Sequence, residues 1–214
     1  EGQIFTNSVV IPQLPDMTGA KWCYGLDFGV VHPSAVVKVY LKDDKAYAEE
    51  CLYRTGMTVA DIIEWFSHQE RGDIYADPSS KMHIKEISQA GYVCVEAHRN
   101  VLERIELCQR DTVYIPESSA HLIKELRGFH WRKDPRDGNH YLQEPAKYND
   151  DAADAYMYGR YGITERYGFA TARPRTLGPI RTGEFSSDRE DMADPFHRKR
   201  FYRTGAPVVT GRFS

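Results

Sequence analysis

The sequence predicts an α/β fold, a mixed β-sheet flanked by helices. Three β-rich segments come first and are joined by short links, a pattern typical of an antiparallel meander. Helix-periodic stretches then alternate with short apolar segments, as they do where helices connect parallel strands. A single sheet with an antiparallel first part and parallel later strands accounts for both patterns.

The three strands of the meander are expected at Trp22–Phe28, Ala35–Leu41 and Ala46–Tyr53. These segments are rich in β-branched and aromatic residues, which favour strands. The first strand ends at Gly29. The turn at Lys42–Lys45 contains two aspartates, which suit a tight connection between the second and third strands.

After the meander, the spacing of apolar residues changes from about two to about 3.6, the helical period. Polar residues that suit helix caps precede several of the helical stretches. The predicted elements are, in order, a helix after Thr58, strand Asp73–Ala76, a helix after Ser80, strand Tyr92–Glu96, a helix after Asn100, strand Thr112–Ile115, a helix around Leu122–Leu126 capped by Ser118 or Ser119, a hairpin of Phe129–Lys133 and His140–Gln143, and a helix Asp150–Tyr161 capped by Asn149.

The chain divides into three regions: a linker or edge segment at 1–21, a folded domain at 22–162, and an extended tail at 163–214 that contains much Arg, Gly and Pro. Residues 164–214 carry ten Lys and Arg and six Asp and Glu, a net charge of +4, so the rest carries −7 of the whole-chain charge of −3. An acidic body suits carboxylates that hold cations, although solubility alone also explains it.

Composition and motifs exclude several classes of protein. The four cysteines lie far apart without a CxxC pair, so we expect free core thiols rather than a zinc site. No apolar run is long enough to span a bilayer, and no membrane partner is expected. The chain begins at Glu1 rather than Met, which suggests a fragment of a longer protein. It contains no GxxxxGK[ST] phosphate loop, so we expect no ATPase site.

Three aspartates stand where a sheet can bring them together. Asp27 ends the first strand in YGLDFG, and Asp77 follows a separate strand in IYADPSS. Asp154 lies within the last helix, in NDDAADAYMY, among alanines small enough to allow a close approach to the sheet edge. Converging carboxylates repel one another unless a cation intervenes. Sites made only of oxygen select Mg²⁺ or Mn²⁺, and paired ions are the recurring arrangement for phosphodiester cleavage.

Each aspartate also has a purely structural explanation. Asp27 can simply end a strand, and Asp77 with the following proline can form a turn. Asp150 and Asp151 lie in the first helical turn, where acids interact favourably with the helix dipole. Asp154 is harder to explain in this way, because it lies beyond the cap on an alanine-rich face. The three acids in this order, rather than any one of them, favour a functional site.

The order of these motifs resembles the nuclease domain of tailed-phage large terminases. The segments that carry the resemblance are GLDFG at 25–29, HPSA at 32–35, ADPS at 76–79, SSAHLIKELRGFHW at 118–131, EP at 144–145 and DDAADA at 150–155. They extend in order over about Trp22–Gly162. The resemblance implies a ribonuclease H-like fold with an extra β-hairpin. It also implies an endonuclease that cuts double-stranded DNA with two divalent ions, Mg or Mn.

By this resemblance, Asp27, Asp77 and Asp154 are the catalytic residues and the principal metal ligands. Asp151 is a further ligand, and it stands where many relatives have a histidine, so its ligation is either direct or through water. Two neighbours are candidate accessory residues, Asp150 and His32. The hairpin corresponds to a family element near the DNA path. Its basic residues and one that follows it are candidate DNA contacts, although exposed turns are often charged in any case: Arg132, Lys133, Arg136, His140 and Lys147.

The family joins this nuclease to an N-terminal ATPase motor in the same polypeptide, so we expect the motor upstream of Glu1. The other implied partners are double-stranded DNA, the portal protein and the small terminase subunit. The implied location is the host cytoplasm, transiently at the procapsid portal. No segment resembles a base-reading helix, so we expect DNA binding through phosphates, without sequence preference.

Other interpretations compete with this one. An actin- or sugar-kinase-like phosphotransfer domain also has an acid-x-Gly motif like Asp27–Gly29, but its second phosphate loop and adenosine glycines are not found here. A protein kinase would need a Gly-rich loop and a lysine strand before that motif. Holliday-junction resolvases share the fold and differ in substrate. A non-enzymatic portal-docking module would use FHRKRFYR at 196–203, which also suits nucleic acid or plain solvation.

Overall fold

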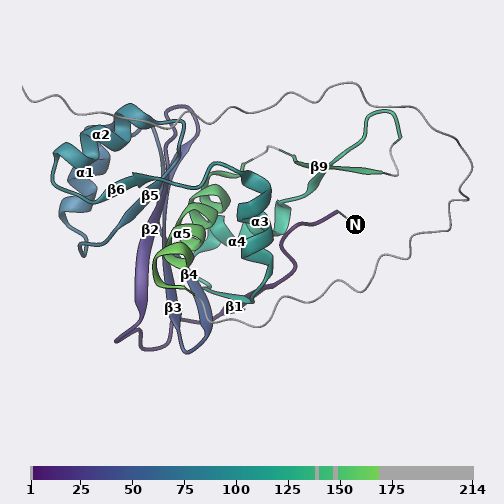
Figure 1. Cartoon of the computed structure of the whole chain (residues 1–214), viewed down its shortest axis with the longest axis horizontal. Helices are drawn as coiled ribbons and strands as arrows, with labels where there is room; N and C mark the ends of the chain where they lie inside the picture. Colours follow the sequence, from purple (N-terminus) through teal and green to yellow (C-terminus); the bar gives the residue numbers. More distant parts are fainter. Residues whose placement is uncertain (1, 138–139, 147–148, 169–214) are drawn as a thin grey trace, which may run out of the picture. The chain divides into compact units, whose positions relative to one another are not determined.

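The computed structural model describes residues 2–137, 140–146 and 149–168. A seven-stranded sheet forms the centre of the domain, with helices on both faces and a separate two-stranded hairpin (Figure 1). The sheet strands are β1 Ser8–Ile11, β2 Lys21–Asp27, β3 Pro33–Lys42, β4 Lys45–Thr55, β5 Ile74–Ala76, β6 Cys94–Glu96 and β7 Val113–Pro116. The helices are α1 Val59–Ser67, α2 Lys81–Gln89, α3 Val101–Gln109, α4 Ala120–Gly128 and α5 Asp151–Tyr167. The hairpin strands are β8 Trp131–Lys133 and β9 Tyr141–Pro145.

The order of strands across the sheet is β1-β7-β4-β3-β2-β5-β6. β2, β3 and β4 pair antiparallel, whereas β7 pairs parallel with β4 and β1, and β5 pairs parallel with β2 and β6. The predicted meander followed by parallel strands is confirmed. The N-terminal segment supplies the edge strand β1, and Ile4 and Phe5 ahead of it are buried in the core. It is therefore more than a linker.

Alternation along β3 divides the core into two layers, because successive residues of a strand point to opposite faces. Ala35 and Val37 join the cluster that contains buried residues of α3, α4 and α5. Val36, between them, joins the cluster formed with α1 and α2, which includes Ile62 and Ile84. The two helical layers in Figure 1 therefore cover opposite faces of one sheet.

The helix α5 packs directly on β2 and β3, and most of its residues are buried (Figure 1). Gly25 of β2 allows the close approach. A Cβ atom at this position would overlap the carbonyl oxygen of Ala155 and lie 2.7 Å from the backbone nitrogen of Gly159. Gly25 and Asp27 lie on the same face of β2, since they are two residues apart. The glycine contact thus brings α5 to the face that carries Asp27.

The helix starts agree with the predicted caps in part. Thr58 caps α1, with its hydroxyl accepting from the backbone N–H of Asp61, and Asn100 caps α3. Ser80 and Ser119 occupy the N-cap positions of α2 and α4, but neither makes a side-chain cap hydrogen bond. The cap residues in the sequence therefore predict where these helices begin, but not which of the cap side chains form hydrogen bonds.

The bounds of α5 differ from those predicted. The helix begins at Asp151, and Asp150 rather than Asn149 is its N-cap residue, without a side-chain cap hydrogen bond. Asn149 instead has a φ of 47°, the left-handed conformation that asparagine tolerates. The helix continues to Tyr167, into the region assigned to the tail, and from residue 169 the tail lies outside the described residues. No helix of the described part of the chain is long and apolar enough to cross a membrane.

The packing of α5 on β2 predicts that Gly25→Ala is strongly destabilising. Overfilling a core typically costs about 1–3 kcal/mol. The atoms that the new methyl group would meet belong to backbone and cannot rotate away, so we expect the free energy of unfolding to fall by about 3 kcal/mol or more. Denaturant unfolding measures this change. Gly128→Ala is the matched control, since a Cβ atom there meets nothing within 4 Å. Similar losses for the two variants would contradict the close approach.

Candidate active site

Asp27 and Asp77 meet at one edge of the sheet, because β2 and β5 are adjacent parallel strands. Leu26 pairs with Ala76 in the register of the two strands. The backbone N–H of Asp77 donates a hydrogen bond to the carbonyl oxygen of Leu26 at 3.0 Å. Each aspartate directly follows one residue of this last pair. The structure thus brings these two predicted site residues together.

Asp27 is the centre of the acidic group. Burial raises the pKa of its carboxyl well above the ordinary 3.8, and the charges of Asp154, Asp77, Asp151 and Asp150 raise it further. Such an effect needs like charges that lie close together with little water between them. All three predicted catalytic acids and their two neighbours at the start of α5 therefore share one region.

Asp77 is held by its own turn. Its carboxylate accepts hydrogen bonds from the backbone N–H of Ser79 at 3.0 Å and from the hydroxyls of Ser79 and Ser80. Burial alone would raise the pKa of Asp77, but these hydrogen bonds and the nearby Arg104 outweigh burial, and the pKa is lowered. Asp77 is thus ionised more readily than Asp27. The turn that offered a structural explanation of Asp77 in the sequence is present, and it holds the carboxylate beside the site.

A buried arginine that sequence reasoning missed faces the same acids. Arg104 of α3 is 5% exposed, and its Nη1 lies 3.5 Å from Oδ1 of Asp154. Its guanidinium lies over the ring of Tyr158, 4.4 Å from the centroid. Among the described residues, its Nε and Nη1 have no hydrogen-bond partner. Arg104 is an internal counter-charge. The sequence does contain a feature that could have identified it: Arg104 lies one turn before Cys108, on the apolar face of α3, where a charged residue is unusual.

The neighbouring residues Asp151, Asp150 and His32 also gather here. Asp151 is 8% exposed, and its pKa is raised by burial and then by Asp150. The exposed His32 lowers the pKa of Asp151, so it lies within electrostatic reach of it. The three predicted catalytic acids therefore lie in one region with Asp151, which was predicted as a further ligand, and with the two predicted accessory residues.

The chemistry of this group fits a hard divalent cation. Its acidic members offer only carboxylate oxygens, and a cation would relieve the repulsion that raises the pKa of Asp27. In the described residues, no three Asp, Glu, His or Cys side chains already form a cluster that could hold an ion. Asp77 is engaged by its serines, and Asp154 faces Arg104. Cation binding would therefore require the carboxylates to move closer together than they lie in this structure.

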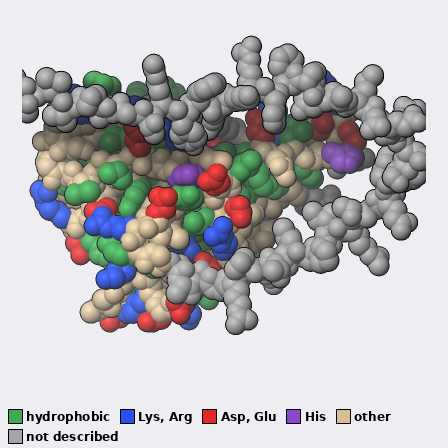
Figure 2. Space-filling model, in the orientation of Figure 1, with side chains coloured by type: hydrophobic (Ala, Val, Ile, Leu, Met, Phe, Trp, Pro, Cys, Tyr) green, Lys and Arg blue, Asp and Glu red, His purple; other side chains and the backbone are tan. Residues whose placement is uncertain are grey.

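The predicted DNA contacts lie on the hairpin β8-β9, apart from Lys147, which is outside the described residues. Arg132 pairs with Glu144 at 2.8 Å, and Lys133 lies over the ring of Tyr141. These two basic residues are exposed, as are Arg136 and His140. Across the face drawn in Figure 2, basic and acidic side chains are interspersed. On that face, no region of the described residues carries basic side chains alone.

No family model matches the sequence, and no curated protein matches it. Solved structures do. The nuclease domain of the large terminase g2p of bacteriophage SPP1, solved with bound Mn, has a TM-score of 0.62 and 17% identity, over 76% of this chain and 97% of that chain. The nuclease domain of the P22 large terminase has a TM-score of 0.55 and 18% identity, over 78% and 93%.

A large terminase from a thermophilic bacteriophage has a TM-score of 0.61 and 20% identity, over 77% of this chain and 45% of that chain. The present chain therefore spans less than half the length of that protein. At these identities, the likeness establishes the fold. The described domain shares the fold of phage large-terminase nuclease domains, as the motifs implied.

Proposed function

We propose that the chain is the nuclease domain of a phage large terminase, a metal-dependent endonuclease that cleaves double-stranded DNA during genome packaging. The observation that carries this proposal is the convergence of four aspartates on the partly buried Asp27, in a fold shared with nuclease domains. The bound Mn of the SPP1 domain supports a divalent cation in this fold.

In this proposal, Asp27, Asp77 and Asp154 hold two Mg²⁺ or Mn²⁺ ions, and Asp151 is a further ligand. Bound in this way, the ions would supply activation of a water nucleophile and stabilisation of the leaving oxygen of the phosphodiester. The protein supplies the shape of the site. The end of β2 and the start of α5 fix the directions from which the carboxylates approach, and Arg104 limits their net charge.

The partners are part of the same proposal. The thermophilic-phage terminase is more than twice as long as its matched part, which supports a linked ATPase motor in the complete polypeptide, with no ATPase site in this chain. The remaining proposed partners are DNA, the portal protein and the small terminase subunit. The proposed place of action is the host cytoplasm, at the procapsid portal.

Cleavage of supercoiled plasmid tests the activity. We expect nicking and linearisation with Mn²⁺ or Mg²⁺, and none with excess chelator. Asp27→Asn and Asp154→Asn should each abolish cleavage, because each keeps the size of the side chain but removes a ligand charge. Asp43→Asn is the matched control: it makes the same change at an exposed turn residue whose φ of 48° suits asparagine. Cleavage in chelator, or by either site variant at the wild-type rate, would refute the proposal.

Binding of duplex DNA tests the proposed role of the hairpin. If Lys133 contacts a phosphate, Lys133→Ala should weaken binding equally for unrelated sequences and lower the slope of log affinity against log salt by about one. Lys85→Ala is the control, because Lys85 is an exposed lysine of α2, on the opposite layer of the domain from α5. Fluorescence anisotropy in chelator measures both variants. Identical affinities and slopes for the two would exclude Lys133 from the interface.

A further inference from the structure

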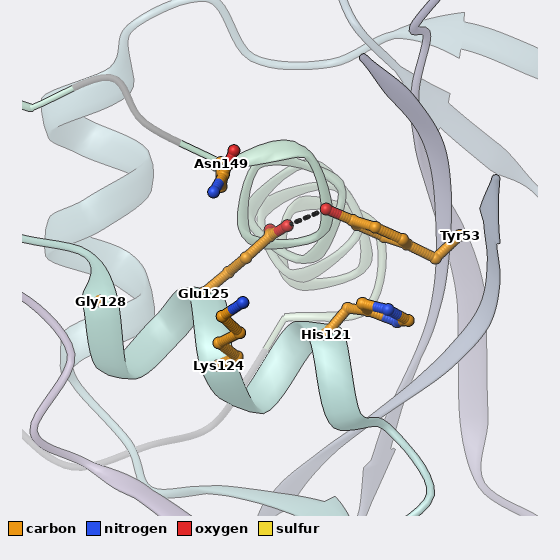
Figure 3. A pocket seen from close by; sticks show the side chains of 6 residues that line it. All are labelled: Tyr53, His121, Lys124, Glu125, Gly128 and Asn149. Carbon is orange, nitrogen blue, oxygen red and sulfur yellow. Dashed lines mark hydrogen bonds between the residues drawn. The ribbon is translucent and has the colours of Figure 1, made fainter. Parts of the chain in front are cut away.

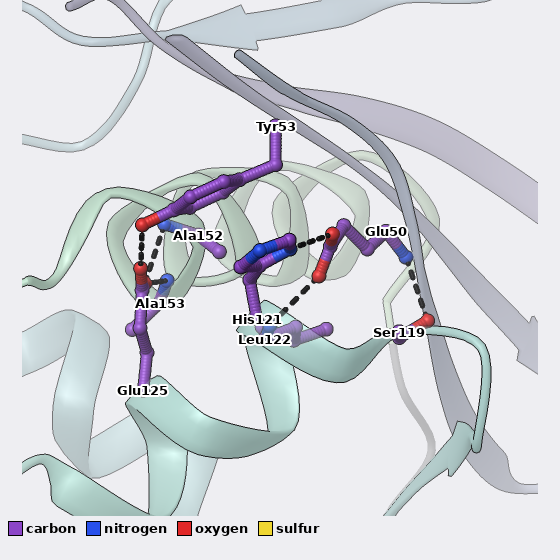
Figure 4. A network of polar contacts seen from close by, with 8 residues as sticks. All are labelled: Glu50, Tyr53, Ser119, His121, Leu122, Glu125, Ala152 and Ala153. Carbon is purple, nitrogen blue, oxygen red and sulfur yellow. Dashed lines mark hydrogen bonds and ion pairs between the residues drawn. The ribbon is translucent and has the colours of Figure 1, made fainter. Parts of the chain in front are cut away.

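A glutamate of a neighbouring helix caps the start of α5. Oε2 of Glu125, in α4, accepts hydrogen bonds from the backbone N–H groups of Ala152 at 2.7 Å and Ala153 at 3.0 Å (Figure 4). These two residues lie between Asp151 and Asp154 in the first turn of α5. The first N–H groups of a helix have no partner within the helix. The N-cap residue of α5 makes no side-chain cap bond, so Glu125 provides this contact from outside the helix.

Glu125 is itself held in place by a second element. Its Oε1 accepts a hydrogen bond from the hydroxyl of Tyr53, in β4, at 2.7 Å. The ring of Tyr53 stacks on His121, with centroids 4.1 Å apart and planes 5° from parallel. Nδ1 of His121 lies 2.7 Å from Glu50, which also accepts from the backbone N–H of Leu122 in α4 (Figure 4). The carboxylate that caps α5 is therefore fixed by both β4 and α4.

Glu125 is buried, but its side chain borders a cavity. The residue is 5% exposed, yet it lines a cavity of about 200 Å³ together with Tyr53, Lys124 and Asn149 (Figure 3). Burial raises the pKa of Glu125 to about 7, although the three hydrogen bonds that it accepts oppose this shift. The cavity leaves room for a substituted side chain to shift without a clash.

We propose that Glu125 is a positioning residue of the acidic site, which fixes the first turn of α5 and so the placement of Asp151 and Asp154 for cation binding. The inference rests on the proposed metal centre. It goes beyond that proposal because Glu125 does not contact the cation and acts only through the backbone of α5. Partners that orient metal ligands commonly affect metal affinity about 10- to 100-fold.

Two conservative substitutions separate positioning from charge. Glu125→Gln keeps an oxygen that can accept from both N–H groups, and its amide can donate to the hydroxyl of Tyr53, but it removes the charge. Glu125→Asp keeps the charge and withdraws the carboxylate from α5 by one methylene group. Titration of the full chain with Mn²⁺, followed by calorimetry, measures the affinity. We expect Glu125→Asp to lower Mn²⁺ affinity about tenfold or more, and Glu125→Gln to stay close to wild type.

Thr58→Ala is the control for a general loss of helix capping, because Thr58 caps α1 in the opposite helical layer. It should lower the melting temperature and leave Mn²⁺ affinity unchanged. Wild-type affinity in Glu125→Asp would overturn the inference, as would an equal loss in both Glu125 variants, which would indicate a role for charge. If the wild-type chain itself bound no Mn²⁺, the proposed metal centre would fail first, and this inference with it.

Discussion

The crowding of Asp27 among four other aspartates is the constraint on which the rest of the site depends. Like charges that approach one another in a poorly hydrated environment destabilise the ionised state, and the raised pKa of Asp27 expresses this cost. A protein gains nothing in stability from such an arrangement. The site is therefore best understood as a place prepared for positive charge. Arg104 already supplies part of that charge from the protein side.

The architecture imposes the convergence in three independent ways. The register of β2 and β5 places Asp27 and Asp77 at one sheet edge. The absence of a side chain at Gly25 allows α5 to approach the same face. Glu125 of α4 then holds the first turn of α5 by accepting two hydrogen bonds from its backbone. Each of these three contacts fixes the position of backbone, which is stiffer than a side chain. The fold therefore determines where the acidic residues lie, more than their own rotamers do.

Local patterns predicted the features that are local in origin. The strands, the helix starts and the acids at strand ends follow from periodicity, cap residues and short motifs. The contacts that were missed join residues far apart in sequence. Arg104 meets Asp154 only through the packing of α3 on α5, and Glu125 reaches α5 from α4. The local sequence predicts Asn149 as the N-cap of α5. It cannot show that the distant Glu125 already accepts hydrogen bonds from backbone N–H groups in the first turn of the helix.

The dependence of stability on pH tests the central claim, that Asp27 is held among the other acids at the cost of charge repulsion. The folded chain binds the proton of Asp27 more tightly than the unfolded chain does, so stability is lost as pH rises from about 4 towards the raised pKa. The measurement is the free energy of unfolding in chelator, for the wild type and Asp27→Asn. We expect the wild type to lose stability relative to Asp27→Asn by up to about 1.4 kcal/mol per pH unit in that window. A difference that does not vary with pH, or one that favours the wild type as pH rises, would contradict the account.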